Sequence, residues 1–271
     1  MTLSLFPKID HLLTDLLRSL TPEDWEKQTL APQWKVKDVA AHLLDGNIRG
    51  ISTSRDGYFG ESPGEMGSYA ELVSFLNRLN ADWVQATRRI SPQVLTDLLE
   101  ITGKMYYEHL KILDMEADAI FSVAWAGEEI STNRFHIARE YTEKWHHQQQ
   151  IRLAVGKEKL LLEPEYYLPF LETSFQALPH HYREIQADNH TVIRFVVPGV
   201  SFRCDLVRIS GKWSLTDTSE IKPDCEVIIP DEIAWRIMTK GISKDSARAQ
   251  LRISGETALG EHFTGMLAVM A

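Results

Sequence analysis

The sequence is poor in cysteine, and its two cysteines, Cys204 and Cys225, are too few to build a disulfide framework. It has no run of the roughly 18–20 apolar residues that a membrane-spanning helix needs. Its first 20 residues place acids within an apolar pattern and lack a basic start, which is unlike a secretory signal peptide. We therefore expect a soluble, cytoplasmic protein with reduced thiols and no membrane partner.

An excess of positive charge is also missing. The formal net charge is −9 and the sequence pI is about 5.6. A protein that follows nucleic-acid phosphates needs a basic face, so we expect no nucleic-acid partner. With 44% hydrophobic and 25% charged residues, the composition is that of a globular protein rather than a disordered or fibrous one. The 271 residues allow one large domain or two ordinary ones.

The first 155 or so residues predict helices, because apolar residues recur at steps of three and four. Prolines and glycines separate these stretches, and the glycine-rich segment 55–67 predicts a loop. The predicted helices cover residues 5–20, 36–51, 68–90, 93–112 and 133–155. Several long helices with no strand between them indicate a helix bundle.

After about residue 160 the pattern changes. Residues 162–185 predict one more helix, either interrupted by Pro169 or ended by Pro179. Alternating or short apolar segments then predict strands at 190–197, 201–210, 212–217 and 225–230. A helix is predicted at 231–241, a helix end or strand at 247–256, and a C-terminal helix at 255–271. We therefore predict an all-α bundle at 1–158 and a small α+β domain at 159–271.

The segment that suggests chemistry is the predicted helix 133–155. At 100° per residue, His136, Glu140, Glu143 and His147 fall within about 60° of one another. Glu143 and His147 are four residues apart, so their side chains can converge on one divalent metal as two of its ligands. The alternative is a solvated helix face, where such a pair contributes only a few tenths of a kcal/mol. A third ligand must come from elsewhere.

His42 is the candidate for that third ligand. It lies beside an apolar helix face that includes Val39 and Leu43, where a lone histidine is more often a core residue. It is, however, the only histidine on its helix, and two helices of a bundle can bring inward-pointing ligands together. We interpret His136 and His146 as surface histidines.

Three segments resemble the mycothiol-dependent maleylpyruvate isomerase family, which belongs to the DinB-like metal-binding four-helix bundles. They are DWEKQTLAPQWKVKDVAAHLLDG, AWAGEE and AREYTEKWHHQQQIRLAVG. The resemblance implies that His42, Glu143 and His147 hold a metal. It also implies a small sterol-carrier-like C-terminal domain, to which AWRIMTKG and ARAQLRISGETAL are similar. Two residues depart from the family pattern: Lys35 replaces a threonine cap, and Gln150 replaces an aspartate three residues after the second histidine.

Three protein ligands leave a position open, as in catalytic metal sites. Zinc is the first choice, and nickel or iron would accept the same donors. Neither cysteine lies in the bundle, so an external thiol such as mycothiol, bacillithiol or glutathione, or water, would occupy the open position. The resemblance implies a thiol-dependent S-transferase or cis–trans isomerase acting on a small molecule. Arg139 and Arg236 are candidates for contacting a substrate carboxylate.

Two other functions stay open at this point. The first is a metal-dependent hydrolase that uses metal-bound water, with Glu140 as general base. The second is a non-catalytic metal-binding protein whose C-terminal domain binds a small ligand. The sequence does not choose between a monomer and a homodimer.

Overall fold

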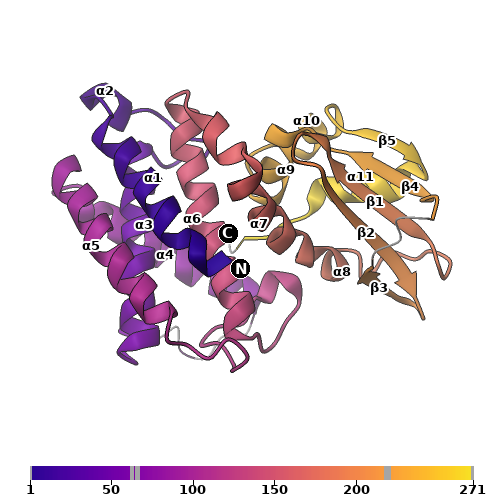
Figure 1. Cartoon of the computed structure of the whole chain (residues 1–271), viewed down its shortest axis with the longest axis horizontal. Coiled ribbons are helices and arrows are strands. Elements are labelled where there is room, and N and C mark those ends of the chain that lie inside the picture. The colour runs from indigo at the N-terminus through magenta and orange to yellow at the C-terminus, as the bar shows by residue number, and fades with distance from the viewer. Residues whose placement is uncertain (1, 62–63, 65–67, 217–220, 270–271) are drawn as a thin grey trace. The chain divides into compact units, whose positions relative to one another are not determined.

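The computed structural model describes residues 2–61, 64, 68–216 and 221–269, and it divides into two compact units (Figure 1). The first unit holds the chain up to Phe121 and Thr132–Glu158, and the second holds Ser122–Ser131 and Lys159–Val269. The expected fold class, a helical bundle and a small α+β part, is confirmed. Domain limits at 1–158 and 159–271 remain a prediction.

Four helices of the first unit pack in a ring: α1 contacts α5 and α6, and α3 contacts the same two helices. A further helix, α4, packs against α3. The predicted helices are therefore confirmed, with ends that differ by a few residues. The bounds are α1 Phe6–Arg18, α2 Pro22–Trp25, α3 Val36–Gly50, α4 Tyr69–Thr87, α5 Pro92–Leu110 and α6 Asn133–Ala154.

The helix ends follow local chemistry. Ser91 caps α5 by accepting from the Val94 N–H, and Thr132 caps α6 by accepting from the Phe135 N–H. At the start of α3, the backbone N–H of Lys35 donates to the Asp38 carboxylate over 3.0 Å. The carboxylate of Asp38 therefore satisfies a free N–H at this helix start although no threonine precedes the helix.

A buried apolar cluster holds the bundle together. Its members come from α1, α3, α5 and α6, so each helix of the ring buries one face against the others. The cluster includes Leu13, Leu16, Leu17, Val36, Val39, Ala40, Leu44, Leu95, Leu99 and Ile151. Trp25, from α2, belongs to the same cluster.

Beyond Gly50, α3 continues as one π-helical turn, Ile51–Arg55. Of the predicted loop 55–67, residues 62–63 and 65–67 lie outside the described part of the chain. In the π-helical turn, Ser54 Oγ lies 2.7 Å from Nε2 of His109 on α5. This contact joins the end of α3 to the end of α5.

The second unit is built on a five-stranded sheet in the order β3-β2-β1-β4-β5. Neighbouring strands are antiparallel except β1 and β4, which run parallel. The strand bounds are β1 Val192–Val197, β2 Phe202–Ile209, β3 Lys212–Leu215, β4 Cys225–Ile228 and β5 Arg252–Gly255. Because side chains alternate along a strand, Ile193, Phe195 and Val197 share one fully buried face.

Helices cover that buried face. Aromatic rings of Phe175, Phe195 and Phe263 meet with centroids 5.0–5.9 Å apart. The helix bounds are α7 Pro164–Ser174, α8 Leu178–His181, α9 Asp231–Met238, α10 Lys244–Arg248 and α11 Thr257–His262. Helix α11 packs on β4 and β5, and α8 packs on β3.

Two predictions in this unit need correction, and one, for 247–256, is confirmed in both of its alternatives. Pro169 lies inside α7 rather than interrupting it, and Pro179 opens the short α8 rather than ending a helix. The segment 247–256 contains both a helix end and a strand, in α10 and β5. The C-terminal helix is shorter than predicted, because α11 ends at His262 and a 3₁₀ turn follows at Phe263–Gly265.

The segment Ser122–Ser131 belongs to the second unit although it lies between two bundle helices in the sequence. Val123 and Trp125 are buried. Gly127 has a positive φ of 81°, and a Cβ atom there would collide with the His180 ring on α8. Glycine is therefore required at this close approach.

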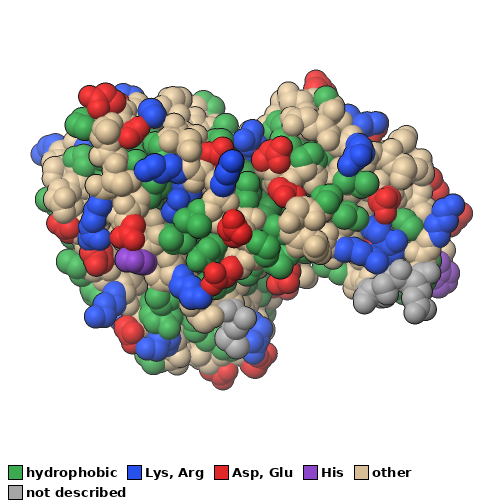
Figure 2. Space-filling model, turned by 45° about the horizontal axis from the view of Figure 1, so that its top comes forward, with side chains coloured by type: hydrophobic (Ala, Val, Ile, Leu, Met, Phe, Trp, Pro, Cys, Tyr) green, Lys and Arg blue, Asp and Glu red, His purple; other side chains and the backbone are tan. Residues whose placement is uncertain are grey.

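On the face drawn in Figure 2, acidic and basic side chains of the described residues are interspersed rather than separated. Among the helices of the described chain, none combines the length and apolarity that crossing a lipid bilayer requires.

Candidate metal centre

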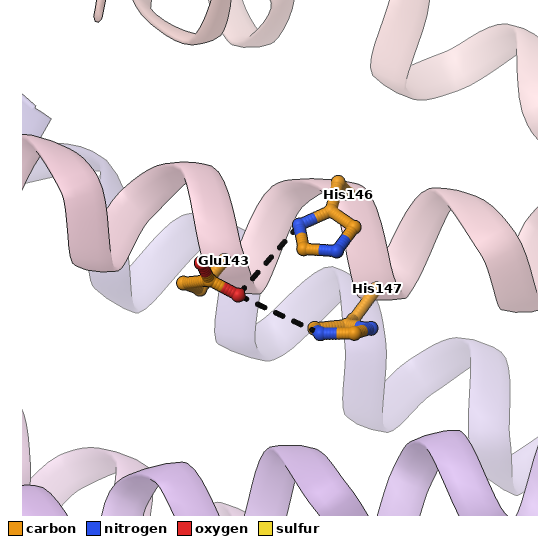
Figure 3. A group of neighbouring side chains, drawn as sticks. All are labelled: Glu143, His146 and His147. Atoms are coloured by element: carbon orange, nitrogen blue, oxygen red, sulfur yellow. Dashed lines mark ion pairs between the residues drawn. The ribbon is translucent and has the colours of Figure 1, made fainter. Parts of the chain in front are cut away.

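Three side chains on α6 form a group whose ligand atoms lie within 4.8 Å of one another: Glu143, His146 and His147 (Figure 3). Glu143 Oε2 lies 3.6 Å from His147 Nε2 and 3.9 Å from His146 Nδ1. Helical side chains three and four residues apart share one face, which explains the convergence. The expected pairing of Glu143 with His147 is present in the structure.

Hydrogen bonds orient both imidazoles. His147 Nδ1 lies 3.0 Å from Gln150 Oε1, and His146 Nδ1 lies 3.0 Å from the Thr142 carbonyl oxygen. An amide or carbonyl oxygen only accepts, so each Nδ1 carries the proton and donates. Nε2 is then the lone-pair nitrogen on both rings, as in metal-binding histidines whose other nitrogen is hydrogen-bonded.

His42 reaches the same place from α3. Its ring centroid lies 4.5 Å from that of His147 and 4.8 Å from that of Trp34. The structure thus brings the rings of His42 and His147 together, but the group with ligand atoms within 4.8 Å contains His146 instead of His42. The triad His42, Glu143 and His147 therefore remains a prediction.

Burial and charge set the protonation states. Burial lowers the pKa of His42 well below its usual value, and the neighbouring His147 lowers it further. Burial lowers the pKa of His146 to about 3. Burial alone would raise the pKa of Glu143, but its contacts with His147, His146 and Arg139 outweigh burial and hold it well below the usual range. A charged carboxylate and neutral imidazoles are the forms that bind cations.

A second polar cluster lies one turn toward the start of α6. Arg139 Nη2 contacts the Glu140 carboxylate and lies 3.4 Å from His136 Nδ1. Tyr106 is a buried residue of α5, and burial and the charge of Glu140 raise its pKa well above the usual value. Burial alone would lower the pKa of Arg139, but the charges of Glu140 and Glu143 raise it, so the guanidinium stays charged.

The sequence interpretation missed two buried residues. His136 and His146 are 5% and 4% exposed, so the interpretation of both as surface histidines is wrong. Trp145 of the same helix is fully buried. Most of the buried residues of α6 are polar. Both histidines therefore lie on faces of this helix that are not solvated.

The remaining candidates lie in the second unit. Arg236 is on α9, with its guanidinium 5.6 Å from the ring centroid of Trp235. Cys225 is buried on β4 and Cys204 is half-buried on β2. Burial raises their pKa values to about 11 and about 12, respectively. The two cysteines are therefore protonated, unreactive side chains, as expected from the sequence.

The donor set of Glu143, His146, His147 and the nearby His42 suits a borderline divalent cation such as zinc, nickel or iron. Carboxylate oxygen and imidazole nitrogen are both present. The Nδ1 atoms of His146 and His147 already make hydrogen bonds to Thr142 and Gln150. Fold and site together define a helical bundle with a candidate metal centre, joined in one chain to a small α+β unit.

The family model for the mycothiol maleylpyruvate isomerase N-terminal domain matches residues 6–152, more than half of the chain. The chain belongs to this family. A solved structure of a substituted mycothiol-dependent maleylpyruvate isomerase is similar, with a TM-score of 0.57 and 10% identity over 93% of this chain and 91% of that one. Another solved structure of a mycothiol-dependent maleylpyruvate isomerase has a TM-score of 0.52 and 12% sequence identity, and the match covers 87% of this chain and 86% of that one. No curated protein sequence matches.

Proposed function

We propose that the chain is a metal-dependent enzyme that uses a low-molecular-weight thiol to transfer sulfur to, or isomerise, a small molecule. The observation that supports this most is the pairing of an ionised Glu143 with the lone-pair nitrogen of His147, 3.6 Å apart, beside the ring of His42. In this proposal His42, Glu143 and His147 are the metal ligands. Zinc is the first choice, and nickel or iron fits the same donors.

The bound cation would supply one effect, a lowered pKa for a thiol that coordinates it. Because Cys204 and Cys225 lie in the second unit and stay protonated, the thiol comes from outside the chain. The two similar solved structures are named as mycothiol-dependent. Mycothiol is therefore the first candidate, and bacillithiol or glutathione offers the same reactive group.

Arg139 is proposed to bind a carboxylate of the substrate. The Glu140 carboxylate holds its guanidinium on one side. A planar guanidinium can bind a second carboxylate through its other N–H groups. Arg236, on α9 of the second unit, stays a sequence-based candidate for contacting a substrate carboxylate.

The alternative in which Glu140 is the general base of a hydrolase has less support. A general base needs a free carboxylate oxygen within reach of a water molecule. Arg139 engages the Glu140 carboxylate, so it acts better as an anchor for Arg139 than as a proton acceptor.

Metal analysis of the purified full-length protein tests the metal site. We expect about one equivalent of zinc, nickel or iron in the wild type and strongly reduced content in His42→Ala and in the isosteric Glu143→Gln. The control is His11→Ala, because His11 and Asp15 form an exposed acid–histidine pair four residues apart on α1. Equal metal content in all four proteins would refute the site.

Thiol dependence is tested separately on the metal-loaded protein. A ligand that binds only the folded state raises the melting temperature. We expect a rise with mycothiol that is absent in Glu143→Gln, and thiol-dependent isomerisation of maleylpyruvate. Turnover without any thiol would favour the hydrolase, and thiol-independent melting without turnover would favour a non-catalytic metal-binding protein.

A further inference from the structure

We infer that Arg49 on α3 binds a carboxylate of the substrate, as a second cationic group in addition to Arg139 on α6. The inference rests on the proposed function and adds to it a residue that the sequence did not single out. The starting observation is the position of Arg49 on its helix. It follows His42 by seven residues, or about two helical turns, so the two side chains lie on the same face of α3.

That face of α3 has open space between the two side chains. Gly46 lies about one turn from each of them, and a Cβ atom there would meet no atom of the described residues within 4 Å. A small molecule can therefore lie against the helix between His42 and Arg49. Burial and the charge of His147 lower the pKa of His42 most, and the charge of Arg49 lowers it further. The guanidinium is thus close enough to act electrostatically on the proposed metal site.

The opposing helix, α6, runs antiparallel to α3. The ring centroid of His42 lies 4.5 Å from that of His147. Asn47, further along α3, accepts a hydrogen bond from Lys144, which comes earlier on α6. Residue numbers that rise along α3 therefore fall along α6, and Arg49 lies at the level of the α6 residues that precede Lys144.

The surroundings of Tyr106, on α5, place Arg139 at this same level. A Cβ atom on Gly50, next to Arg49 in the chain, would lie 2.5 Å from Cζ of Tyr106. Burial raises the pKa of Tyr106 most, the charge of Glu140 raises it further, and the charge of Arg139 lowers it. Tyr106 is therefore near both the end of α3 and the turn of α6 that carries Arg139.

Each of the two arginines is held by a carboxylate of its own helix. Arg49 Nε lies 2.8 Å from Asp45 Oδ2, and Arg139 Nη2 donates to the Glu140 carboxylate. The Asp45 side chain is only 9% exposed, so this is not a fully solvated surface pair. The Arg49 side chain is 40% exposed, and a guanidinium held on one side can bind a second carboxylate through its other N–H groups.

Calorimetric titration of the full-length protein, as purified and without added thiol, tests the inference with two probes. Succinylpyruvate is maleylpyruvate with its double bond saturated and has two carboxylates, whereas acetylpyruvate keeps the dioxo acid end and has one. We expect Arg49→Gln to weaken succinylpyruvate binding about 10–100-fold, which is the loss of one charge-assisted contact. Acetylpyruvate binding should change much less, because Arg139 alone can hold one carboxylate.

The matched control is Arg18→Gln. The Arg18 side chain is also 40% exposed and also pairs with a carboxylate, that of Glu100, but it lies on α1. This variant should bind both probes as the wild type does. A purely structural role of Arg49 would weaken the binding of both probes equally, and that result would overturn the inference. Unchanged succinylpyruvate binding in Arg49→Gln, or a wild type that binds neither probe, would also overturn it.

A second variant decides if circular dichroism shows that Arg49→Gln does not fold. Arg49→Lys keeps the charge but loses the planar fork, so it should lower the affinity for succinylpyruvate relative to acetylpyruvate. An unchanged ratio of the two affinities would then overturn the inference.

Failure of this inference differs from failure of the proposed function. Thiol-dependent turnover together with unchanged probe binding in Arg49→Gln would remove Arg49 alone. Weakened succinylpyruvate binding in that variant, in a protein whose wild type shows no metal or thiol dependence, would support Arg49 as a carboxylate-binding residue and refute the proposed enzyme.

Discussion

A Cβ atom placed on Gly50 would lie 2.5 Å from Cζ of Tyr106. Gly50 ends α3, and Tyr106 is a buried residue of α5 whose pKa is raised by burial and by the charge of Glu140 on α6. The absence of a side chain on α3 thus makes room for a buried aromatic ring of α5.

The first prediction concerns this contact. Gly50→Ala forces the buried ring of Tyr106 to shift, and overpacking of this kind costs about 1–3 kcal/mol of unfolding free energy. Gly46→Ala, on the same helix, meets nothing within 4 Å and should stabilise the protein by about 0.5–1 kcal/mol through helix propensity. Urea denaturation of both variants checks this. Equal effects of the two substitutions would contradict it.

The second prediction concerns Gln150, which accepts the hydrogen bond from His147 Nδ1. Gln150→Ala removes this acceptor, and loss of such a support typically weakens metal binding about 10–100-fold. Gln150→Glu places a carboxylate there, which should make His147 more basic and tighten binding. Calorimetric titration with zinc or nickel measures both affinities. The exposed Gln85→Ala on α4 is the control and should leave affinity unchanged.

The third prediction concerns a buried ion pair between α1 and α6. Lys144 Nζ donates to Asp10 Oδ1 over 2.7 Å and to Asn47 Oδ1 over 2.8 Å. Asp10→Ala leaves the ammonium buried without its carboxylate and should cost about 3–5 kcal/mol of unfolding free energy. Glu108→Ala breaks an exposed pair with Lys111 and should cost less than about 1 kcal/mol.

Adding Lys144→Met to Asp10→Ala separates charge from packing in this prediction. The double variant removes both charges, so it should recover part of the lost stability in chemical denaturation. A double variant as unstable as Asp10→Ala alone would show that the buried ammonium is not the cause.

The fourth prediction concerns pH and the second unit. His181 Nε2 lies 2.9 Å from the His262 carbonyl oxygen, and burial lowers the pKa of His181 to about 4. An unfolded histidine titrates near 6.5, so between about pH 6.5 and 4 the unfolded chain binds a proton that the folded chain does not. His181 therefore stabilises the fold above pH 6.5 and loses this contribution as pH falls toward 4.

Urea midpoints at pH 7 and pH 4.5 measure this loss. His181→Gln should reduce the drop in midpoint between the two values, because glutamine does not titrate. The exposed His11→Gln should show the wild-type drop. If His181→Gln also shows the wild-type drop, the protonation of His181 does not contribute.

The fifth prediction concerns the proposed role of Arg139. Arg139→Lys keeps the charge but loses the planar fork that can hold Glu140 and a substrate carboxylate together. We expect the KM for maleylpyruvate to rise about tenfold with a smaller change in kcat, since mainly binding is lost. Arg134→Lys, an exposed residue paired with Glu116, is the control. An unchanged KM would remove Arg139 from the substrate site.

Much of the fold could be predicted because periodicity follows from burial. The apolar steps of α1 and the alternation of β1 each reflect one buried face, and both elements were predicted within a few residues. The position of Pro169 inside α7 could not be predicted, because the local rule for proline favours a break.

The site was predicted less completely. The spacing of Glu143 and His147 fixes their convergence, because both lie on one helix. The approach of His42 depends on how α3 and α6 pack, so the sequence offered His42 only as a candidate third ligand, and the family resemblance then implied it. His146 was missed because the sequence interpretation took it for a surface histidine, although side chains three residues apart on a helix share one face. In the structure it is 4% exposed and lies beside Glu143.

The grouping of Ser122–Ser131 with the second unit bears on how the protein can be divided. The chain leaves the bundle after Phe121, returns at Thr132 and leaves again after Glu158. A protease cut or a stop codon after Glu158 would leave Val123 and Trp125 without the residues that bury them. A fragment that reproduces either unit therefore needs a redesigned connection at Ser122–Ser131, and a single cut cannot produce it.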